Sequence, residues 1–172
     1  MMVSLKGKKI VLSKVKKNDL KYFQLWRNTY DIWKNNTQFI FLNTIYQRHW
    51  FSTLSSKDKV MFTVTNQKNK PIGVCGFTNI DFENKHAKIA IIVGYTKLHS
   101  KGIGSETMRL LLRYGFEELK LHRIEAEIIE YNKISIKFFK KFGFKFESSL
   151  RDCMWRENSW WNIEKFSLIN KN

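Results

Sequence analysis

Hydrophobic residues recur along the chain at two spacings, one typical of strands and one typical of helices. Seven of the eight positions from Ala87 to Gly94 are apolar or glycine, which indicates an apolar strand. After a polar connection, residues recur with the period of a single helical face, namely Met108, Leu111, Leu112, Gly115, Phe116 and Leu119. The centre of the chain is therefore predicted to form a strand, a turn and an amphipathic helix.

The same spacings predict the remaining elements. Strands are expected at Lys8–Ser13, Val60–Asn66, Pro71–Ile80, His122–Glu130, Phe144–Leu150 and Asn162–Ile169. Helices are expected after an Asn18-Asp19 cap with Leu20, Phe23 and Trp26, from a Thr44–Gln47 capping box with Tyr46, Trp50 and Leu54 along one stripe, and from Asn132 to Phe142 with Gly143 as the end cap. Because no linker, repeat or low-complexity segment separates them, residues 1–172 are predicted to be one α/β domain of the α+β kind, a mixed sheet with helices on both faces.

The composition indicates a folded protein of a reducing compartment. A 172-residue chain with 43% hydrophobic residues, one proline and eight glycines can bury a core and is not typical of disorder. Its apolar runs are shorter than the roughly 18–20 residues that span a membrane, and Met1–Lys9 lacks the apolar region of a signal peptide. Cys75 and Cys153 are isolated and have no metal-ligand spacing, so we expect a cytoplasmic protein with free thiols and no metal.

The charge is large but does not choose a partner. Thirty-one lysines and arginines against fifteen acidic residues give a net charge of +16. Such a field attracts anions, which include nucleic acid, acidic membranes, coenzyme A and nucleotide-linked substrates. The lysines are scattered, however, and a well-solvated lysine-rich surface explains the same composition.

The turn between the central strand and helix is a candidate anion site. Gly102-Ile103-Gly104 stands where the helix is predicted to open, and the N–H groups of a first helical turn have no acceptor within the helix. Glycines let the backbone approach a phosphate without an intervening Cβ. Because the chain has neither a Gly-Lys-Ser/Thr motif nor a third glycine with an acidic residue about 20 positions on, the two common nucleotide motifs are absent. We interpret the turn as the cradle of a cofactor pyrophosphate, although glycines in such turns often serve the turn alone.

Four segments, in order, resemble motifs of the GNAT acetyltransferases. His99–Gly104 is similar to the family's Gln/Arg-x-x-Gly-x-Gly/Ala motif, which grips the pyrophosphate of acetyl-CoA. Asn132–Phe144 resembles the segment Asn-x-x-Ala/Ser-Ile-x-x-Tyr-x-x-x-Gly-Phe. Pro71–Val74 and Leu121–Glu125 look like the strands that precede these motifs. The resemblance covers most of the chain, is nearest to ribosomal-protein N-terminal acetyltransferases, and implies a mostly antiparallel central sheet.

The resemblance also implies which residues hold acetyl-CoA. Backbone groups of the central strand would contact the pantetheine and the oxyanion, and amides of the glycine turn would contact the phosphates. His99 replaces the usual Gln or Arg, so Lys101 is the expected source of positive charge. The cofactor-binding residues expected in this way are Ile91, Ile92, Val93, His99, Ser100, Lys101, Gly102, Ile103, Gly104, Ser105, Asn132 and Phe139.

Acetyl transfer to an amine needs a neutral nucleophile, donors for the oxyanion and a proton for the leaving thiolate. Many GNAT enzymes supply that proton from a tyrosine where this chain has Phe139, which has none to give. Ser135, one helical turn earlier, is therefore the candidate acid, unless it only caps or packs in its helix. Glu125 and Glu127 are the candidate bases, because the strand period places both on one face. Glu130 falls on the other face.

The acceptor pocket is expected in three aromatic segments, which are Trp26–Phe41, the second helix with His49 and Trp50, and Arg151–Trp161. All six tryptophans lie there, and the candidate substrate-binding residues are Trp26, Arg27, Trp33, His49 and Trp50. Each tryptophan could equally fill the core. Trp26-Arg27-Asn28 and His49-Trp50-Phe51 resemble acetyltransferases of nucleotide-linked amino sugars, for which Arg27 would meet a phosphate.

We therefore expect an acetyl-CoA-dependent N-acetyltransferase that acts on a small amine, such as a nucleotide-linked amino sugar, by direct transfer in a ternary complex. A protein N-terminus is the alternative acceptor, whereas polycations such as spermidine are disfavoured by repulsion from a +16 chain. A nucleic-acid-binding module would explain the charge but would leave the glycine turn without a role. An acyl-CoA sensor without catalysis would explain Phe139, and a homodimer stays open.

Overall fold

The computed structural model describes residues 4–38 and 40–171. Its strands are β1 (Leu5–Lys6), β2 (Ile10–Lys14), β3 (Val60–Asn66), β4 (Pro71–Asp81), β5 (His86–Val93), β6 (Arg123–Ile129), β7 (Lys145–Arg156) and β8 (Ser159–Ile169). Its helices are α1 (Leu20–Arg27), α2 (Tyr30–Trp33), α3 (Thr44–Ser52), α4 (Ile103–Arg113) and α5 (Lys133–Lys141). Short 3-10 turns occupy residues 17–19, 53–55 and 96–98, and a π-helical turn occupies residues 114–118.

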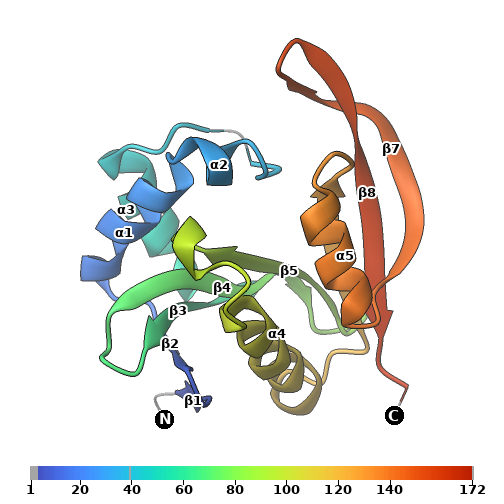
Figure 1. The fold of residues 1–172 in the computed structure, drawn as a ribbon. Coiled ribbons are helices and arrows are strands. Elements are labelled where there is room, and N and C mark those ends of the chain that lie inside the picture. The colour runs from blue at the N-terminus through green and yellow to red at the C-terminus, as the bar shows by residue number, and fades with distance from the viewer. Residues whose placement is uncertain (1–3, 39, 172) are drawn as a thin grey trace.

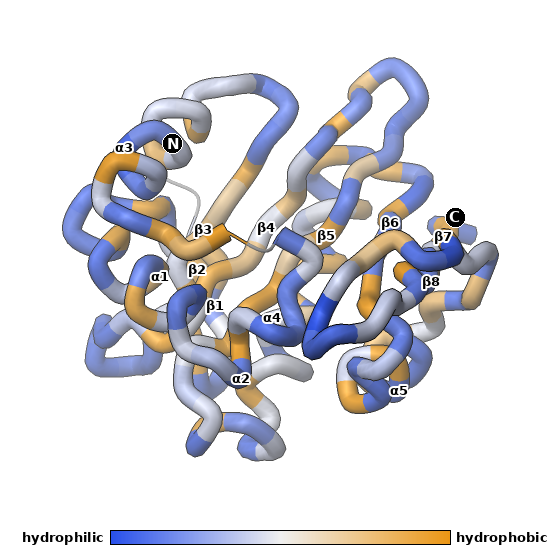
Figure 2. The backbone as a smooth tube through the Cα atoms, turned by 90° about the horizontal axis from the view of Figure 1, so that it is seen from above, coloured by the Kyte–Doolittle hydropathy of each residue, from blue (hydrophilic) through white to orange (hydrophobic). Residues whose placement is uncertain are grey.

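The strands form one mixed sheet in the order β1-β2-β3-β4-β5-β6-β8-β7. Neighbouring strands are antiparallel except β5 and β6, which run parallel and are joined through α4. Helices cover both faces, with α1–α3 gathered on one side and α4 and α5 on the other (Figure 1). Hydrophobic segments run through the β3–β4 part of the sheet, whereas the outer turns are mainly hydrophilic (Figure 2). The predicted α+β architecture and mostly antiparallel sheet are confirmed.

Alternate residues of β5 enter two separate cores. Ala87 and Ile89 belong to a large cluster that includes Met108 and Leu111 of α4. Ile92 packs instead against the cluster of Phe23, Trp26 and their neighbours under α1 and α3. The continuous apolar run found in the sequence therefore has a structural cause, because β5 is covered on both faces.

Several local predictions need correction. Helix α3 is capped by Asn43, whose Oδ1 accepts the N–H of Tyr46 at 2.9 Å, and not by Thr44. Gln47, and not the half-exposed Tyr46, is the buried residue of that helix. Asp19 makes no cap bond to α1; its carboxylate accepts from Thr63 Oγ1 at 2.6 Å and from the N–H of Lys16 at 2.9 Å.

Some element bounds also differ from the predictions, and two short elements were not predicted. Helix α4 becomes a π turn after Arg113, where Gly115 lets the chain approach the ring of Phe77. Strand β7 continues to Arg156 because it pairs with β8 past two irregularities in the register. The short elements β1 and α2 carry no period long enough to predict.

Candidate active site

Strands β5 and β6 run side by side over only three residue pairs and then diverge. The last pair is Lys88 with Glu125. Beyond it, β5 pairs only with β4 as far as Val93, and β6 pairs only with β8 as far as Ile129. We call the point of divergence the fork. Among the described residues, the β5 edge that faces β6 beyond the fork has no partner strand, so its N–H and C=O groups are available to an extended ligand, except that His99 contacts the carbonyl of Val93.

The glycine turn follows the end of β5. Ser100 and Gly102 both have positive φ, 61° and 84°, and α4 begins at the next residue, Ile103. The first hydrogen bond of the helix is donated by Glu106 N–H to Gly102 O. Within the described parts of the chain, the amides of residues 103–105 have no acceptor. Three N–H donors without acceptors at the positive end of an 11-residue helix have the chemistry to receive an anion.

Gly104 lies where α4, α5 and β5 meet. A Cβ built on Gly104 would lie 3.7 Å from the ring of Phe138 and 3.8 Å from Val93 Cγ2, which are ordinary contacts. Its φ is not in the left-handed region, so neither packing nor backbone conformation requires glycine here. What glycine provides is a bare first turn, and this feature fits the phosphates of a CoA molecule.

His99 and Lys101 lie on either side of the positive-φ Ser100. The exposed His99 ring places Nε2 3.3 Å from Val93 O, which lets a ring N–H donate to the end of β5. Lys101 is exposed, and its carbonyl accepts from Lys9 Nζ at 3.0 Å. Thus a second lysine, which the sequence did not single out, reaches the loop from the start of β2.

The candidate acid lies in the first turn of α5. Asn132 Oδ1 accepts the N–H of Ser135 at 3.1 Å, so Asn132 is the N-cap of this helix. Ser135 is half-buried, and in the described structure its hydroxyl makes no hydrogen bond. Phe139 packs edge-on against Phe144, with 5.0 Å between ring centroids, so its ring has a hydrophobic partner and its helix has no phenol at this position.

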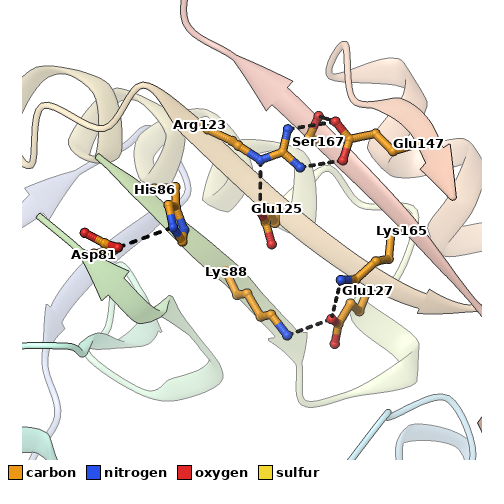
Figure 3. A network of polar contacts seen from close by, with 9 residues as sticks. All are labelled: Asp81, His86, Lys88, Arg123, Glu125, Glu127, Glu147, Lys165 and Ser167. Atoms are coloured by element: carbon orange, nitrogen blue, oxygen red, sulfur yellow. Dashed lines mark hydrogen bonds and ion pairs between the residues drawn. The ribbon is translucent and has the colours of Figure 1, made fainter. Parts of the chain in front are cut away.

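Both candidate bases belong to a network of ion pairs on one face of the sheet (Figure 3). Glu127 accepts from Lys88 Nζ at 2.6 Å, and Lys165 Nζ lies 3.9 Å away. Glu125 accepts from Arg123 Nε at 2.9 Å. The two carboxylates therefore share a face, as the period predicted, and each is matched to a cation.

Arg123 also binds Glu147 of β7 through both terminal nitrogens, one of them 2.7 Å from Oε1. This guanidinium, together with the hydroxyl of Ser167, lowers the pKa of the Glu147 carboxyl to about 2. The same bonds raise the pKa of Arg123. Arg123 thus joins Glu125 to Glu147, whereas Glu127 is the first carboxylate of β6 beyond the fork.

Glu130 has a structural role. Its carboxylate accepts from Asn162, at 2.7 Å from the backbone N–H and 3.3 Å from the side-chain amide. These bonds extend the β6–β8 ladder past its last residue pair.

The predicted substrate-binding residues do not lie together. Trp26 is 1% exposed, so the structure corrects its assignment to an acceptor pocket: it is a core residue. Trp50 packs edge-on against Phe23 in the same cluster, at 5.9 Å between centroids. His49 is exposed on α3.

Arg27 and Trp33 lie around the segment that follows α1. Arg27 donates to Gln38, at 3.2 Å to Oε1 and 3.4 Å to the carbonyl, and burial without a facing carboxylate lowers its pKa. Trp33 stacks near Tyr30 and carries the guanidinium of Arg156 6.0 Å from its ring centroid.

The β7–β8 hairpin contacts this same segment, so two of the aromatic segments expected around the acceptor do meet, although their individual contacts were not predicted. Arg156 donates to Asn36 O at 3.4 Å, and the hydroxyl of Tyr30 hydrogen-bonds to Glu157. Tyr131 reaches the carbonyl of Lys34 and packs edge-on against Trp161. The aromatic richness of both segments was the available signal, but no spacing connects residues more than 100 positions apart.

The described side chains do not form a metal site. In residues 4–38 and 40–171, no group of three His, Cys, Asp or Glu side chains is placed to hold a metal ion. The same residues contain no helix long and apolar enough to cross a membrane.

Comparison with known proteins decides the family. A family model described as "Acetyltransferase (GNAT) domain" matches residues 9–145, more than half of the chain. The chain belongs to the GNAT acetyltransferase family. The predicted resemblance to the GNAT acetyltransferases is thereby confirmed at the level of the family.

Sequence relatives of this GNAT chain agree but match in part. An uncharacterized N-acetyltransferase, p20, of Bacillus licheniformis is 35% identical over 108 residues, 63% of this chain and 60% of that protein. Acetyltransferase PseH of Campylobacter jejuni is 27% identical over 69% of this chain and 72% of its own length. The matches span 60%, 42% and 30% of three curated relatives, so these proteins are longer than the part they share with this chain.

Solved structures share the fold. A spermidine N-acetyltransferase from Vibrio cholerae, in complex with CoA and spermine, has a TM-score of 0.87 at 16% identity and covers 95% of this chain and 96% of its own. A GNAT-family acetyltransferase from Bacillus anthracis has a TM-score of 0.81 at 23% identity, with 97% and 98% covered. At these low identities, the high TM-scores show that the fold is shared.

Proposed function

We propose that this chain is an acetyl-CoA-dependent N-acetyltransferase that acts on the primary amine of a small molecule by direct transfer in a ternary complex. The observation that carries the proposal is the meeting of two open ligand sites. The unpaired edge of β5 beyond the fork ends at Val93, and the bare first turn of α4 at Gly104 lies next to that residue. One extended ligand with a phosphate group can engage both.

The residues that would hold CoA fit its chemistry. The amides of residues 103–105 would donate to the phosphates, and backbone groups of Ile91–Val93 would hydrogen-bond to the pantetheine amides and to the developing oxyanion. When bound, acetyl-CoA supplies a thioester that an amine can attack. The protein would contribute alignment of the two substrates at the fork.

Ser135 and Glu127 are the groups we assign to proton transfer. Ser135 has a half-buried hydroxyl without a partner in the described structure, and its helix is held to α4 through the contact of Phe138 beside Gly104. Glu127 is the first carboxylate past the fork on the face that carries Lys88. Because Lys88 Nζ already donates to it at 2.6 Å, this carboxylate would act by orienting the amine or a water that takes its proton.

For the acceptor, we propose an amine that carries a phosphate, such as a nucleotide-linked amino sugar. Some structural neighbours act on spermidine. A polyamine, however, needs unpaired carboxylates, and on this side of the chain Glu127 is matched to Lys88 and Asp31 to Lys34. Arg27 has no carboxylate partner among the described residues and could receive a phosphate.

The proposed function is tested by following thiol release from acetyl-CoA in the presence of matched amines. Glucosamine and glucosamine 6-phosphate differ only in the phosphate, and spermidine tests the polyamine class. We expect turnover that is faster with the phosphorylated amine. Binding of acetyl-CoA without turnover of any amine would indicate an acyl-CoA sensor, and salt-dependent RNA binding without CoA affinity would overturn the proposal.

Ser135→Ala is expected to lower kcat by roughly 10- to 100-fold while leaving the Kd of acetyl-CoA unchanged, because the lost group acts only on the leaving sulfur. The measurement is steady-state kinetics together with isothermal titration. In the Ser135→Ala background, Phe139→Tyr supplies a phenol one helical turn away and should restore part of the rate. An unchanged kcat in Ser135→Ala would show that the hydroxyl only packs in α5.

A further inference from the structure

The turn between β1 and β2 is attached to the first turn of α4, nearly 100 residues later in the chain. The N–H of Lys9 donates to Glu106 Oε1 at 3.0 Å, and Lys9 Nζ donates to Lys101 O at 3.0 Å. Gly7 makes this approach possible, because a Cβ there would lie 2.1 Å from Glu106 Oε1. Lys9, directly before β2, is thus hydrogen-bonded both to the glycine turn and to the first turn of α4.

We propose that Lys9 binds the pyrophosphate of CoA and that Glu106 is the residue that positions it. This inference rests on the proposed function, since it assigns a further side chain to the same cofactor. It concerns neither the backbone amides of the turn nor Lys101, which the sequence already indicated.

The position of the Lys9 ammonium supports the first half of the proposal. A Cβ on Gly102 would lie 3.5 Å from Lys9 Nζ, so the ammonium stands beside the residue that opens α4. Lys9 is exposed, and within the described residues no carboxylate forms an ion pair with its ammonium. One N–H is used by Lys101 O, and two remain for a phosphate.

Electrostatics gives the ammonium a second effect. A carbonyl oxygen near an anion site repels the ligand, and Lys101 O lies in the loop that would surround the phosphates. Lys9 covers this oxygen with a positive charge and so removes the repulsion. Lys9 thus brings a second lysine to the loop that already contains Lys101.

The buried carboxylate of Glu106 supports the second half of the proposal, that Glu106 positions Lys9. Glu106 is 9% exposed in the first turn of α4, where a negative charge suits the helix dipole but opposes an incoming phosphate. In the described structure, the one hydrogen bond that its carboxylate accepts comes from the N–H of Lys9. Its position is therefore explained by holding the turn, and with it the ammonium, against the loop.

The test compares Lys9→Met with Lys8→Met by isothermal titration at low salt. Lys8 is the exposed neighbour, so both variants lose one charge and differ only in contact with the loop. We expect the Kd of CoA to rise about five- to tenfold in Lys9→Met and less than twofold in Lys8→Met. Thermal unfolding of both variants checks that the fold is intact.

Truncated ligands identify the group that Lys9 meets. Dephospho-CoA keeps the pyrophosphate and lacks the 3′-phosphate, so the effect of Lys9→Met should persist with it. Pantetheine lacks both, and with it the two variants should bind equally. If dephospho-CoA abolishes the difference, the contact is with the 3′-phosphate and the assignment is wrong.

Glu106 is tested by two substitutions. Glu106→Gln keeps an oxygen for the Lys9 N–H and should retain CoA affinity, whereas Glu106→Leu should weaken it as Lys9→Met does. The double variant with Lys9→Met should be no weaker than either single variant, since both remove one contact. Equal affinities of Lys9→Met and Lys8→Met for CoA would overturn the inference while wild-type binding upheld the proposed function. Loss of CoA binding in the wild type would refute both.

Discussion

Gly104→Trp is expected to raise the Kd of acetyl-CoA more than 100-fold, about 3 kcal/mol or more. The indole would occupy the bare first turn of α4, where three amides point toward the proposed phosphate position. A Cβ at this position would already contact Phe138 and Val93. We therefore expect the larger indole to extend into the proposed phosphate position. Isothermal titration of both proteins measures the effect.

Gly104→Ala is the matched control. Its Cβ would find the ring of Phe138 at 3.7 Å and Val93 at 3.8 Å, so the fold has room for it. CoA affinity within a few-fold of wild type is expected, with stability unchanged or slightly higher because alanine favours the helix. If Gly104→Trp unfolds the protein, the titration says nothing, so circular dichroism of each variant accompanies it. Retained affinity in a folded Gly104→Trp would place the cofactor elsewhere.

Trp26→Ala is expected to lower the free energy of unfolding by about 3–5 kcal/mol. The side chain is 1% exposed and packs against Phe23, Tyr95 and the backbone of Gly94, where a Cβ would lie 2.1 Å from the indole. Truncation leaves a cavity at the end of β5 that these neighbours can close only in part. Urea denaturation gives the difference.

Trp160→Ala provides the comparison, because this tryptophan is 58% exposed at the hairpin and should cost less than about 1 kcal/mol. Trp26→Phe should also be milder than Trp26→Ala. The indole Nε1 is buried without a partner in the described structure, so phenylalanine removes an unsatisfied donor along with some volume. A small effect of Trp26→Ala would contradict the core assignment and return this residue to the list of acceptor contacts.

The elements with a sustained period could be predicted from the sequence. The apolar run at Ala87–Gly94, the helical face of Met108–Leu119 and the hairpin of β3 and β4 all formed within a few residues of the predicted bounds. The glycine turn was found for the same reason, since a strand, two glycines and a helical face are local features.

What could not be predicted depends on contacts between distant segments. The periods placed Glu125 and Glu127 on one face, but nothing in the sequence indicated that Lys88 and Arg123 would neutralise them. Trp26 could belong to a core or to a pocket, because an indole suits both. Lys9 had no signal at all, since its meaning comes from a contact with Lys101 across 92 residues.

The three residue pairs between β5 and β6 are the only strand pairing by which the described sheet joins two antiparallel halves, β1–β5 and β6–β8–β7. The hairpins β3–β4, β4–β5 and β7–β8 close locally, whereas this parallel seam closes only after the chain has passed through α4, so we expect it to form after those hairpins. A ligand seated along β5 would act as a substitute for the missing strand. At a free concentration 100 times its Kd, such a ligand adds about 2.7 kcal/mol to the stability of the fold. For this chain, resistance to proteolysis would then follow the supply of its own cofactor.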